Sequence, residues 1–370
     1  MEDGTWRLTH QPALDGLRGV AITFVMLAHT QVGAVHAAGT VGVTVFFTLS
    51  GFLITSLLLQ DLDDHGTVRL GRFFNRRARR LAPALFVFLA AMAVLGAASR
   101  SPVVPDARDI VGSLLYVGNY TGAMAGRDTA ILHTWSLAVE EQFYLAWPVA
   151  LLALARVSRG RWLVPVLCAL ILASVVGRFA AWDGGRGILR VTYGTDMRVD
   201  ALLVGCLVAV HLHQRGPARQ RSGATGAALL GLAAMAFVGV RWEALVVTAL
   251  VPLLTGLALL QLAGGGASIL SATPLGLLGR RSYGIYLWHY PIFALASAAP
   301  PEQRVVAWPI AVCVTAAIAH LSWRCIEEPF LQKGGSDRGE DWRGLRDPSK
   351  VRTDVRGSGS PGPRGRRAES

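Results

Sequence analysis

The sequence predicts an all-α, polytopic membrane protein in which about ten helices cross the bilayer as one bundle. Hydrophobic residues make up 52% of the 370 residues, charged residues only 16%, and the mean hydropathy is +0.42. A soluble domain of this length would carry about a quarter charged residues. The apolar residues are also gathered in blocks of about 20, which is the length that an α-helix needs to cross about 30 Å of hydrocarbon.

Ten such blocks follow one another along the chain. In order they are 14–34, 40–60, 81–99, 133–155, 162–182, 196–213, 224–240, 242–262, 282–298 and 305–326. Segment 109–121 is also apolar, but it is too short to span, so we expect a re-entrant or interfacial piece there. The first block does not have the pattern of a cleavable signal peptide, because it contains Asp15, Arg18 and His29.

The placement of arginine residues orients the bundle. The linker 61–80 contains six arginines, and short basic loops stay in the cytoplasm. If 109–121 does not span, the later arginine-rich turns fall on the same side, which predicts cytoplasmic N- and C-termini. We therefore expect a cytoplasmic N-terminus at 1–13, a transmembrane domain at 14–330, and a disordered, basic cytoplasmic tail at 331–370.

Composition also excludes several function classes. Membrane orientation explains the net charge of +12 better than nucleic-acid binding does, because the basic residues sit in the predicted cytoplasmic loops and tail. The four cysteines are scattered singly through apolar blocks, without the spacing of a disulfide framework or a metal site, so no metal is expected. Nucleotide-binding glycine motifs and the common hydrolase motifs are absent from the sequence.

Several ionisable residues lie inside the predicted spans, where each costs about 2.5–3.5 kcal/mol on insertion scales. Arg18 and His29 are eleven residues apart in the first block, so they share one helix face and lie about 16 Å apart along its axis. Glu140 and Glu141 enter the fourth block from the outer side, at a depth close to that of His29. A histidine near a carboxylate is a suitable base for a hydroxyl substrate.

Structural explanations of the same residues stay open at this point. Arg18 can extend to the cytoplasmic interface, and His29 can be a hydrogen-bonded structural histidine. Asp196, Arg198 and Asp200, at the start of the sixth block, fit a buried ion-pair and packing device better than a catalytic centre. His289 lies within the aromatic run YGIYLWHYPIF, which fits a structural role.

The motifs, taken together, resemble the acyltransferase-3 family of membrane acyltransferases. The matching segments are LDGLRG (14–19) followed by His29, FFTLSGFLIT (46–55), FFNRRARRLAPAL (73–85), HTWSLAVEEQFYLAWP (133–148), DMRVDALLVG (196–205), LGRRSYGIYLWHYPIF (278–293) and EEPF (327–330). They occur in order and extend over 14–330. One departure is Thr44, where many members have aspartate, so no carboxylate role is expected there.

The resemblance implies a multi-pass protein of the bacterial cytoplasmic membrane that transfers an acyl group from cytosolic acyl-CoA, with acetyl-CoA the first candidate, to a hydroxyl. Typical acceptors are carbohydrates of the cell envelope, glycolipids and macrolide-type natural products. The resemblance also implies that this chain acts as a single module, without a fused extracytoplasmic domain. It implies that His29 is catalytic and Arg18 its essential partner, and that an Arg-x-x-Arg pair is required, either Arg76/Arg79 or Arg77/Arg80.

The resulting hypothesis is that the arginine-rich stretch holds the CoA phosphates. The acyl end then reaches His29, which takes the proton of the acceptor hydroxyl while Glu140, or alternatively Glu141, orients the imidazole. Arg18 lies too far from His29 to touch it and is assigned to the donor or to helix packing. Candidates for substrate contact are Glu141, Asp200, Tyr283 and His289. A covalent acyl-histidine route and a transporter without acyl-transfer chemistry remain alternatives.

Overall fold

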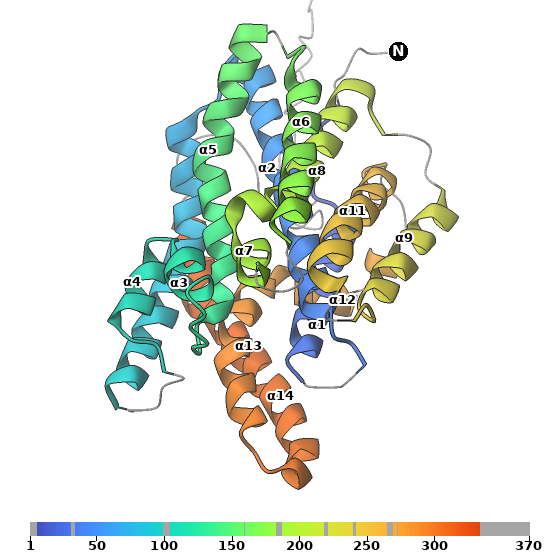
Figure 1. Cartoon of the computed structure of the whole chain (residues 1–370). Coiled ribbons are helices and arrows are strands. Elements are labelled where there is room, and N and C mark those ends of the chain that lie inside the picture. The colour runs from blue at the N-terminus through green and yellow to red at the C-terminus, as the bar shows by residue number, and fades with distance from the viewer. Residues whose placement is uncertain are drawn as a thin grey trace, which may run out of the picture.

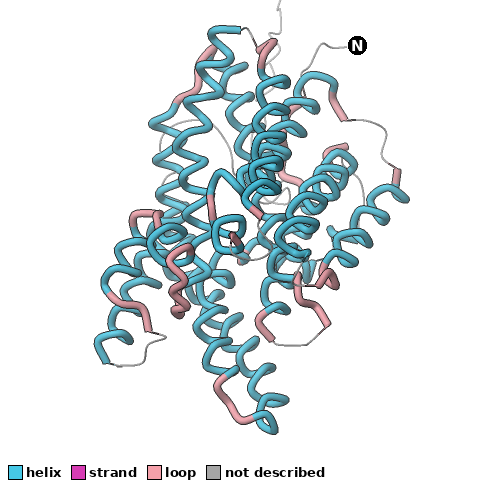
Figure 2. Tube along the Cα trace, viewed as in Figure 1, coloured by secondary structure: helices cyan, strands magenta, loops and turns pink. Residues whose placement is uncertain are grey.

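The structure, a computed structural model, describes residues 6–30, 34–98, 104–158, 160–182, 187–217, 221–239, 242–264, 269–271 and 273–333. Within these ranges every regular element is a helix, as predicted (Figure 2). The expected tail from residue 334 onward and the first five residues lie outside the described residues.

The α-helices in chain order are α1 (Pro12–Ala28), α2 (Ala38–His65), α3 (Leu70–Ala98), α4 (Ala107–Leu114), α5 (Trp135–Ser158), α6 (Leu163–Ala181), α7 (Ile188–Tyr193), α8 (Thr195–Arg215), α9 (Ser222–Met235), α11 (Thr248–Leu262), α12 (Thr273–Arg280), α13 (Ser282–Ser297), α14 (Arg304–Ser322) and α15 (Glu328–Lys333). Short 3-10 or π turns join several of them, namely η1 (Asn119–Ala123), η2 (Leu132–Thr134), η3 (Glu243–Val247), η4 (Ile269–Ser271), η5 (Pro301–Gln303) and η6 (Trp323–Glu327).

Six helical stretches among the described residues are long and apolar enough to cross a membrane. They contain α2, α3, α5, α6, η3 with α11, and α14 with its flanking turns. Large apolar side chains remain exposed on several of them, such as Phe86 on α3, Leu172 on α6 and Val305 on α14. Because water would oppose such faces, their natural neighbour is lipid.

Helix α2 forms the centre of the bundle and packs along α8 (Figure 1). The two helices cross at Gly51 and Gly205, where a Cβ atom would overlap the backbone of Leu202 and of Thr48, respectively. Only glycine permits this approach, and close helix crossings of this kind are typical of membrane bundles.

Helix α1 packs against α2, α12 and α13. Helices α13 and α14 form an antiparallel pair that projects from one end of the bundle in Figure 1. The N-terminal half of α13 therefore lies beside α1, and this contact brings together the polar residues of the two helices.

The helix boundaries differ from the predicted ones most clearly in α3. The prediction began the span at residue 81 and left 61–80 as a linker, whereas α2 continues to His65 and α3 begins at Leu70. The arginine-rich stretch is therefore helical. Arginine and alanine favour helix, and no glycine or proline interrupts residues 72–82.

Segment 109–121 does not form one continuous helix. It contains α4 and the start of η1, and both elements are too short to span. Helix α4 begins with a capping box in which Asp106 accepts a hydrogen bond from the Asp109 amide and Asp109 returns one to the Asp106 amide. This segment lies between α3 and α5 as a folded connection.

Candidate functional site

His29 follows the last residue of α1, and a backbone carbonyl fixes its ring. Its Nδ1 lies 2.8 Å from the Val25 carbonyl oxygen. The His29 amide bonds to the Met26 carbonyl instead, which leaves the Val25 carbonyl available to the ring. Because a carbonyl only accepts, Nδ1 carries the hydrogen and Nε2 keeps a lone pair that can take a proton.

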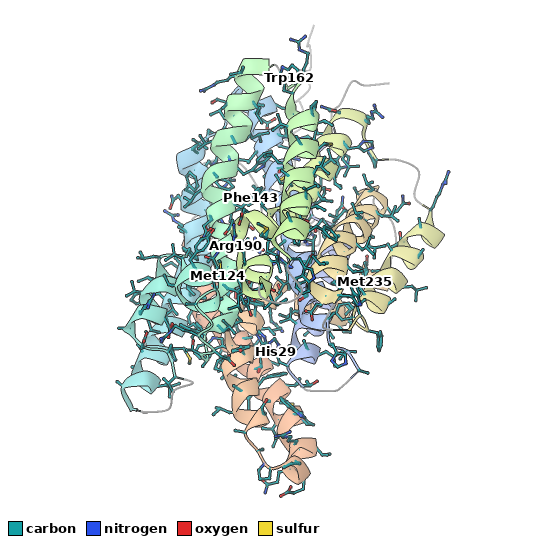
Figure 3. The ribbon with its side chains drawn as sticks, in the orientation of Figure 1. His29, Met124, Phe143, Trp162, Arg190 and Met235 are labelled. Carbon is teal, nitrogen blue, oxygen red and sulfur yellow. The ribbon has the colours of Figure 1, made fainter. Side chains whose placement is uncertain are left out.

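The His29 ring faces other histidines. Its centroid lies 5.1 Å from that of His289 and 5.0 Å from that of Tyr290, both on α13. His133, on η2, lies 5.4 Å from His289 and stacks on Tyr290. Figure 3 shows His29 at the end of α1 beside α13. We call His29, His133 and His289 the histidine cluster.

Burial differs within the histidine cluster. His133 and His289 are buried, whereas His29 is half-buried. In the part of the chain that the structure describes, no group of three or more histidine, cysteine, aspartate or glutamate side chains is arranged to hold a metal ion. The three histidine rings pack edge to face, His289 against both His29 and His133.

Arginines from α1 and α3 meet further along the bundle. Arg18 donates to the Ser282 hydroxyl at 3.1 Å, and Arg80 interacts electrostatically with Arg18 and Arg77. Glu327, in η6, is buried, accepts a hydrogen bond from Ser322, and interacts with both Arg18 and Arg80. We call Arg18, Arg77 and Arg80 the arginine cluster.

Carboxylates on α5 hold one member of the arginine cluster in place. Arg77 donates to Glu141 at 2.7 Å, and its terminal nitrogen lies 4.0 Å from Glu140. Its guanidinium carbon also lies 3.1 Å from the centre of the Tyr144 ring. The Tyr144 hydroxyl bonds to Glu140 and to Ser50 of α2. Arg77 and the two carboxylates thus neutralise one another, which offsets the cost of burying an unpaired charge.

The expected contact between Glu140 and His29 is not formed. Glu140 pairs with Arg77 and Tyr144, and His29 pairs with the Val25 carbonyl. Counting residues gave the depth of Glu140 but not the direction in which its side chain leaves the helix. At that depth Arg77 is the nearby opposite charge, and pairing with it offsets burial of the carboxylate.

Tyr286 on α13 lies between the two clusters. Its hydroxyl donates to the His133 carbonyl at 2.9 Å and lies 2.6 Å from the Ser136 hydroxyl, and its ring contacts His133 and His289. Tyr286 also interacts electrostatically with Glu140. Tyr286 therefore lies between the histidine cluster and Glu140, which pairs with Arg77.

Other predicted site residues have structural partners. Asp200 is buried in an ion pair with the fully buried Arg178 of α6, whereas Asp196 pairs with Arg190. The Tyr283 hydroxyl donates to the Leu81 carbonyl at 2.9 Å. Arg76, Arg79 and Arg80 are all exposed on α3, whereas Arg77 is half-buried. Arg80 interacts electrostatically with Arg18 and Arg77, so of the two possible Arg-x-x-Arg pairs Arg77/Arg80 is the one in the arginine cluster.

Sequence reasoning missed two residues as site candidates. His133 precedes the fourth predicted span in the HTWSLAVEEQ motif, and Glu327 lies in the EEPF motif at the end of the last one. Both were quoted within motifs without a role. The signal for Glu327 was a carboxylate at the border of an apolar block, which requires a buried partner.

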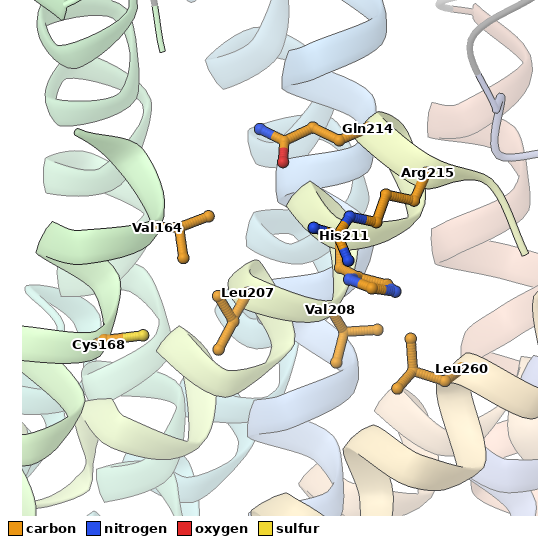
Figure 4. Close-up of a pocket in the computed structure, with 8 residues that line it drawn as sticks. All are labelled: Val164, Cys168, Leu207, Val208, His211, Gln214, Arg215 and Leu260. Carbon is orange, nitrogen blue, oxygen red and sulfur yellow. The ribbon is translucent and has the colours of Figure 1, made fainter. Parts of the chain in front are cut away.

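A cavity of about 370 Å³ opens elsewhere, between α6, α8 and α11 (Figure 4). Its lining is mostly apolar and consists of Val164, Cys168, Leu207, Val208, His211, Gln214, Arg215 and Leu260. No member of the histidine or arginine cluster lines it, so we assign the cavity no part in the site.

Comparison with known proteins identifies the family. A family model described as an acyltransferase domain matches residues 11–324. The chain is 32% identical to the peptidoglycan O-acetyltransferase OatA of Listeria monocytogenes, over 87% of this chain and 56% of that protein. It is 31% identical to the putative peptidoglycan O-acetyltransferase YrhL of Bacillus subtilis, over 87% and 55%, and 30% identical to the O-acetyltransferase OatA of Staphylococcus aureus, over 87% and 57%.

The chain thus spans little more than half the length of these relatives. No solved structure matches it. The family model covers most of the chain and contains both clusters described above, apart from Glu327 beside the arginine cluster. The chain therefore belongs to the acyltransferase-3 family of membrane acyltransferases.

Proposed function

We propose that this chain transfers an acyl group from cytosolic acyl-CoA, with acetyl-CoA as the preferred donor, to a hydroxyl of a saccharide acceptor. The observation that carries the proposal is the His29 imidazole. Its Nδ1 is fixed by the Val25 carbonyl, its Nε2 keeps a lone pair, and its ring faces α13 inside the bundle.

The proposed topology has ten crossings with both termini in the cytoplasm. The crossing helices are α1, α2, α3, α5, α6, α8, α9, α11, α13 and α14. Alternating crossings place the connections after α2, α5, α8 and α11 in the cytoplasm, where the arginine-rich turns belong. His29 then lies on the outer half of the bundle, and Arg18 lies towards the cytoplasm.

The arginine cluster suits the donor. Arg18 and Arg80 bring two positive charges together, and the phosphates of CoA are the anions that such a pair would neutralise. Glu140 and Glu141 hold Arg77 from the opposite side. A flexible pantetheine arm would then carry the thioester along α1 from Arg18 towards His29, about 16 Å away along the helix axis.

The chemical step follows from the free Nε2 of His29. The acceptor hydroxyl gives its proton to Nε2 as its oxygen attacks the thioester carbonyl. The C–S bond breaks, the ester forms, and the same proton neutralises the CoA thiolate. The carbonyls at the end of α1 carry partial negative charge, so the imidazolium forms in a favourable field.

The acceptor class comes from the relatives, whose names describe acetyl transfer to peptidoglycan. We propose a cell-envelope saccharide for this chain, with a glycolipid or a macrolide-type hydroxyl as the next candidates. Each of these three acceptors would present its hydroxyl on the outer side of the membrane. From that side it would reach the half-buried His29.

The test is release of CoA thiol from acetyl-CoA by the purified chain in detergent, with and without a soluble N-acetylglucosamine oligosaccharide. We expect release that depends on the oligosaccharide and yields the acetylated product. We expect His29→Gln to lower this rate by about 10²–10⁴-fold. Oligosaccharide movement across proteoliposomes with no acetylated product would instead identify a transporter and contradict the proposal.

A further inference from the structure

We propose that His133 and His289 recognise a second hydroxyl group of a polyhydroxylated acceptor, by accepting its hydrogen bond while His29 acts on the hydroxyl that is acylated. This inference rests on the proposed transfer to a saccharide and assigns the residues that select for one.

The protonation pattern of the two rings follows from their backbone contacts. His133 Nε2 lies 3.1 Å from the Leu287 carbonyl oxygen, and His289 Nδ1 lies 2.7 Å from the Tyr286 carbonyl oxygen. Carbonyl oxygens accept only, so these two nitrogens carry the ring hydrogens. His133 Nδ1 and His289 Nε2 are therefore acceptors.

Both acceptor nitrogens are buried and have no hydrogen-bond partner among the described residues. His133 is 4% exposed and His289 0% exposed. Buried polar atoms are nearly always paired, and an unpaired one calls for an explanation such as a ligand. Each of these rings pairs one nitrogen with a backbone carbonyl and leaves the other nitrogen unpaired within the histidine cluster.

The two acceptors sit where a substrate would be held. The His289 ring is 5.1 Å from that of His29, and the His133 ring is 5.4 Å from that of His289. The three rings thus lie within the span of one sugar unit. Each sugar unit presents several O–H donors, and these can bond to the acceptor nitrogens of His133 and His289. A cationic or acidic side chain in place of either histidine would match these donors less well.

Tyr290 lies between the histidine cluster and the exposed Asp128. Its ring stacks on His133 and meets His29 edge to face, and its hydroxyl donates to the exposed Asp128 at 3.2 Å. The histidine cluster is thus connected to the outer connection between α4 and α5, and His29 itself is half-buried.

The experiment compares two acceptors with acetyl-CoA as donor and the full chain in detergent. One acceptor is an N-acetylglucosamine oligosaccharide, and the other is 1-butanol, which has one hydroxyl. We expect His133→Phe and His289→Phe each to lower kcat/KM for the oligosaccharide by about 10-fold, the loss of one good hydrogen bond. The butanol rate should fall clearly less than the oligosaccharide rate in each variant, since butanol offers no second hydroxyl for these rings to bind.

Two further variants separate recognition from folding. His289→Gln keeps a hydrogen-bond acceptor of similar reach and should retain most of the oligosaccharide rate. This variant tests the inference even if the phenylalanine variant does not fold. His320→Phe is the matched control, because His320 on α14 also has an unpaired buried nitrogen but makes no ring contact with the histidine cluster among the described residues. This control should leave both rates unchanged.

The outcomes distinguish this inference from the proposed function. A wild-type chain that acetylates both acceptors, with variants that lose neither or lose both equally, overturns the inference alone. The same holds for a glutamine variant as impaired as the phenylalanine one. A wild-type chain that acetylates only butanol overturns the saccharide acceptor of the proposed function, and this inference with it. A wild-type chain that acetylates neither acceptor overturns the proposed function, and this inference with it.

Discussion

His29 owes its orientation to its place directly after the last residue of α1. The last carbonyls of a helix lack a following turn, and one of them, that of Val25, accepts from the imidazole. A helix end also favours a positive charge by about 0.3–1 kcal/mol. The backbone therefore does for this imidazole what a carboxylate does in many histidine-dependent acyl transfers.

The first prediction at the residue scale concerns Glu140. Because it pairs with Arg77 and Tyr144, Glu140→Gln should lower kcat by about tenfold or less and weaken acetyl-CoA binding. Removing a carboxylate that orients a catalytic histidine would instead cost about 10⁴-fold. Steady-state kinetics of the purified variant decide between these. A loss near the larger figure would restore Glu140 as the partner of His29.

The second prediction separates the two Arg-x-x-Arg pairs. Arg80→Met should raise KM for acetyl-CoA by about tenfold or more, because Arg80 faces Arg18 in the arginine cluster. Arg79→Met is the matched control, because Arg79 is next to Arg80 on the same helix and likewise exposed but is not a member of the arginine cluster, and it should change KM little. Donor-concentration series on both variants test this. Equal effects of the two substitutions would contradict the assignment of the donor site.

Which residues matter could largely be predicted from the sequence, but their pairings could not. Arg18 and His29 were placed on one helix face from their spacing, and the structure orients both towards α13. The partner of Glu140 was predicted wrongly, because helical periodicity fixes depth and face on one helix but not the rotation of its neighbours. His133 had no predicted role, since its contacts come from residues about 150 positions away.

At the scale of elements, the connection between α3 and α5 is held by a small charge network. Arg127 bonds to Asp106 at 2.7 Å and to the buried Asp109 at 2.8 Å. The Asp109 amide bonds to the Asp106 carboxylate, and this contact, with the Arg127 charge, holds the pKa of Asp106 below its usual value. The neighbouring Asp128 reaches Tyr290.

This network predicts a pH dependence. A lowered carboxyl pKa contributes stability above the unfolded value, about 3.9, and that contribution is lost as pH falls through the folded value. Amide exchange in residues 106–127, corrected for the intrinsic rate, should therefore rise below about pH 4. Arg127→Gln should raise it already at neutral pH. Unchanged protection in this variant would show that the charge network does not order the segment.

The crossing of α2 and α8 gives a further prediction. Gly205→Val would place side-chain atoms against the Thr48 carbonyl and the Phe52 amide, so it should lower stability by about 1–3 kcal/mol or more. Gly226→Val on α9, where a Cβ has no heavy atom within 4 Å, is the control. Thermal unfolding in detergent measures both. Equal unfolding temperatures would mean that the helices separate at this crossing without cost.

Element types were predictable because long apolar blocks allow little besides helix. Boundaries were less predictable, and α3 begins eleven residues before its predicted start because charged helix formers extend it beyond the apolar block. The six stretches that meet length and hydropathy criteria do not include α1 or α13. These two helices have only 17 and 16 residues, so they fall short of the length that marks a membrane span.

At the scale of the whole molecule, the two clusters lie at different depths of one bundle and are joined by α1, α13 and Tyr286. This separation fits a reaction whose donor and acceptor come from opposite sides of the membrane. A soluble enzyme would have no reason to keep the two binding regions about three helical turns apart. We therefore predict a sided reaction.

The most direct measurement uses proteoliposomes in which protein orientation has been determined. Radiolabelled acetyl-CoA is supplied on the side of the arginine cluster, and an impermeant N-acetylglucosamine oligosaccharide on the side of His29. We predict labelled oligosaccharide only in this arrangement, and a labelling rate about 10²–10⁴-fold lower for His29→Gln. Equal labelling with both substrates on the arginine side, or undiminished labelling by His29→Gln, would contradict it.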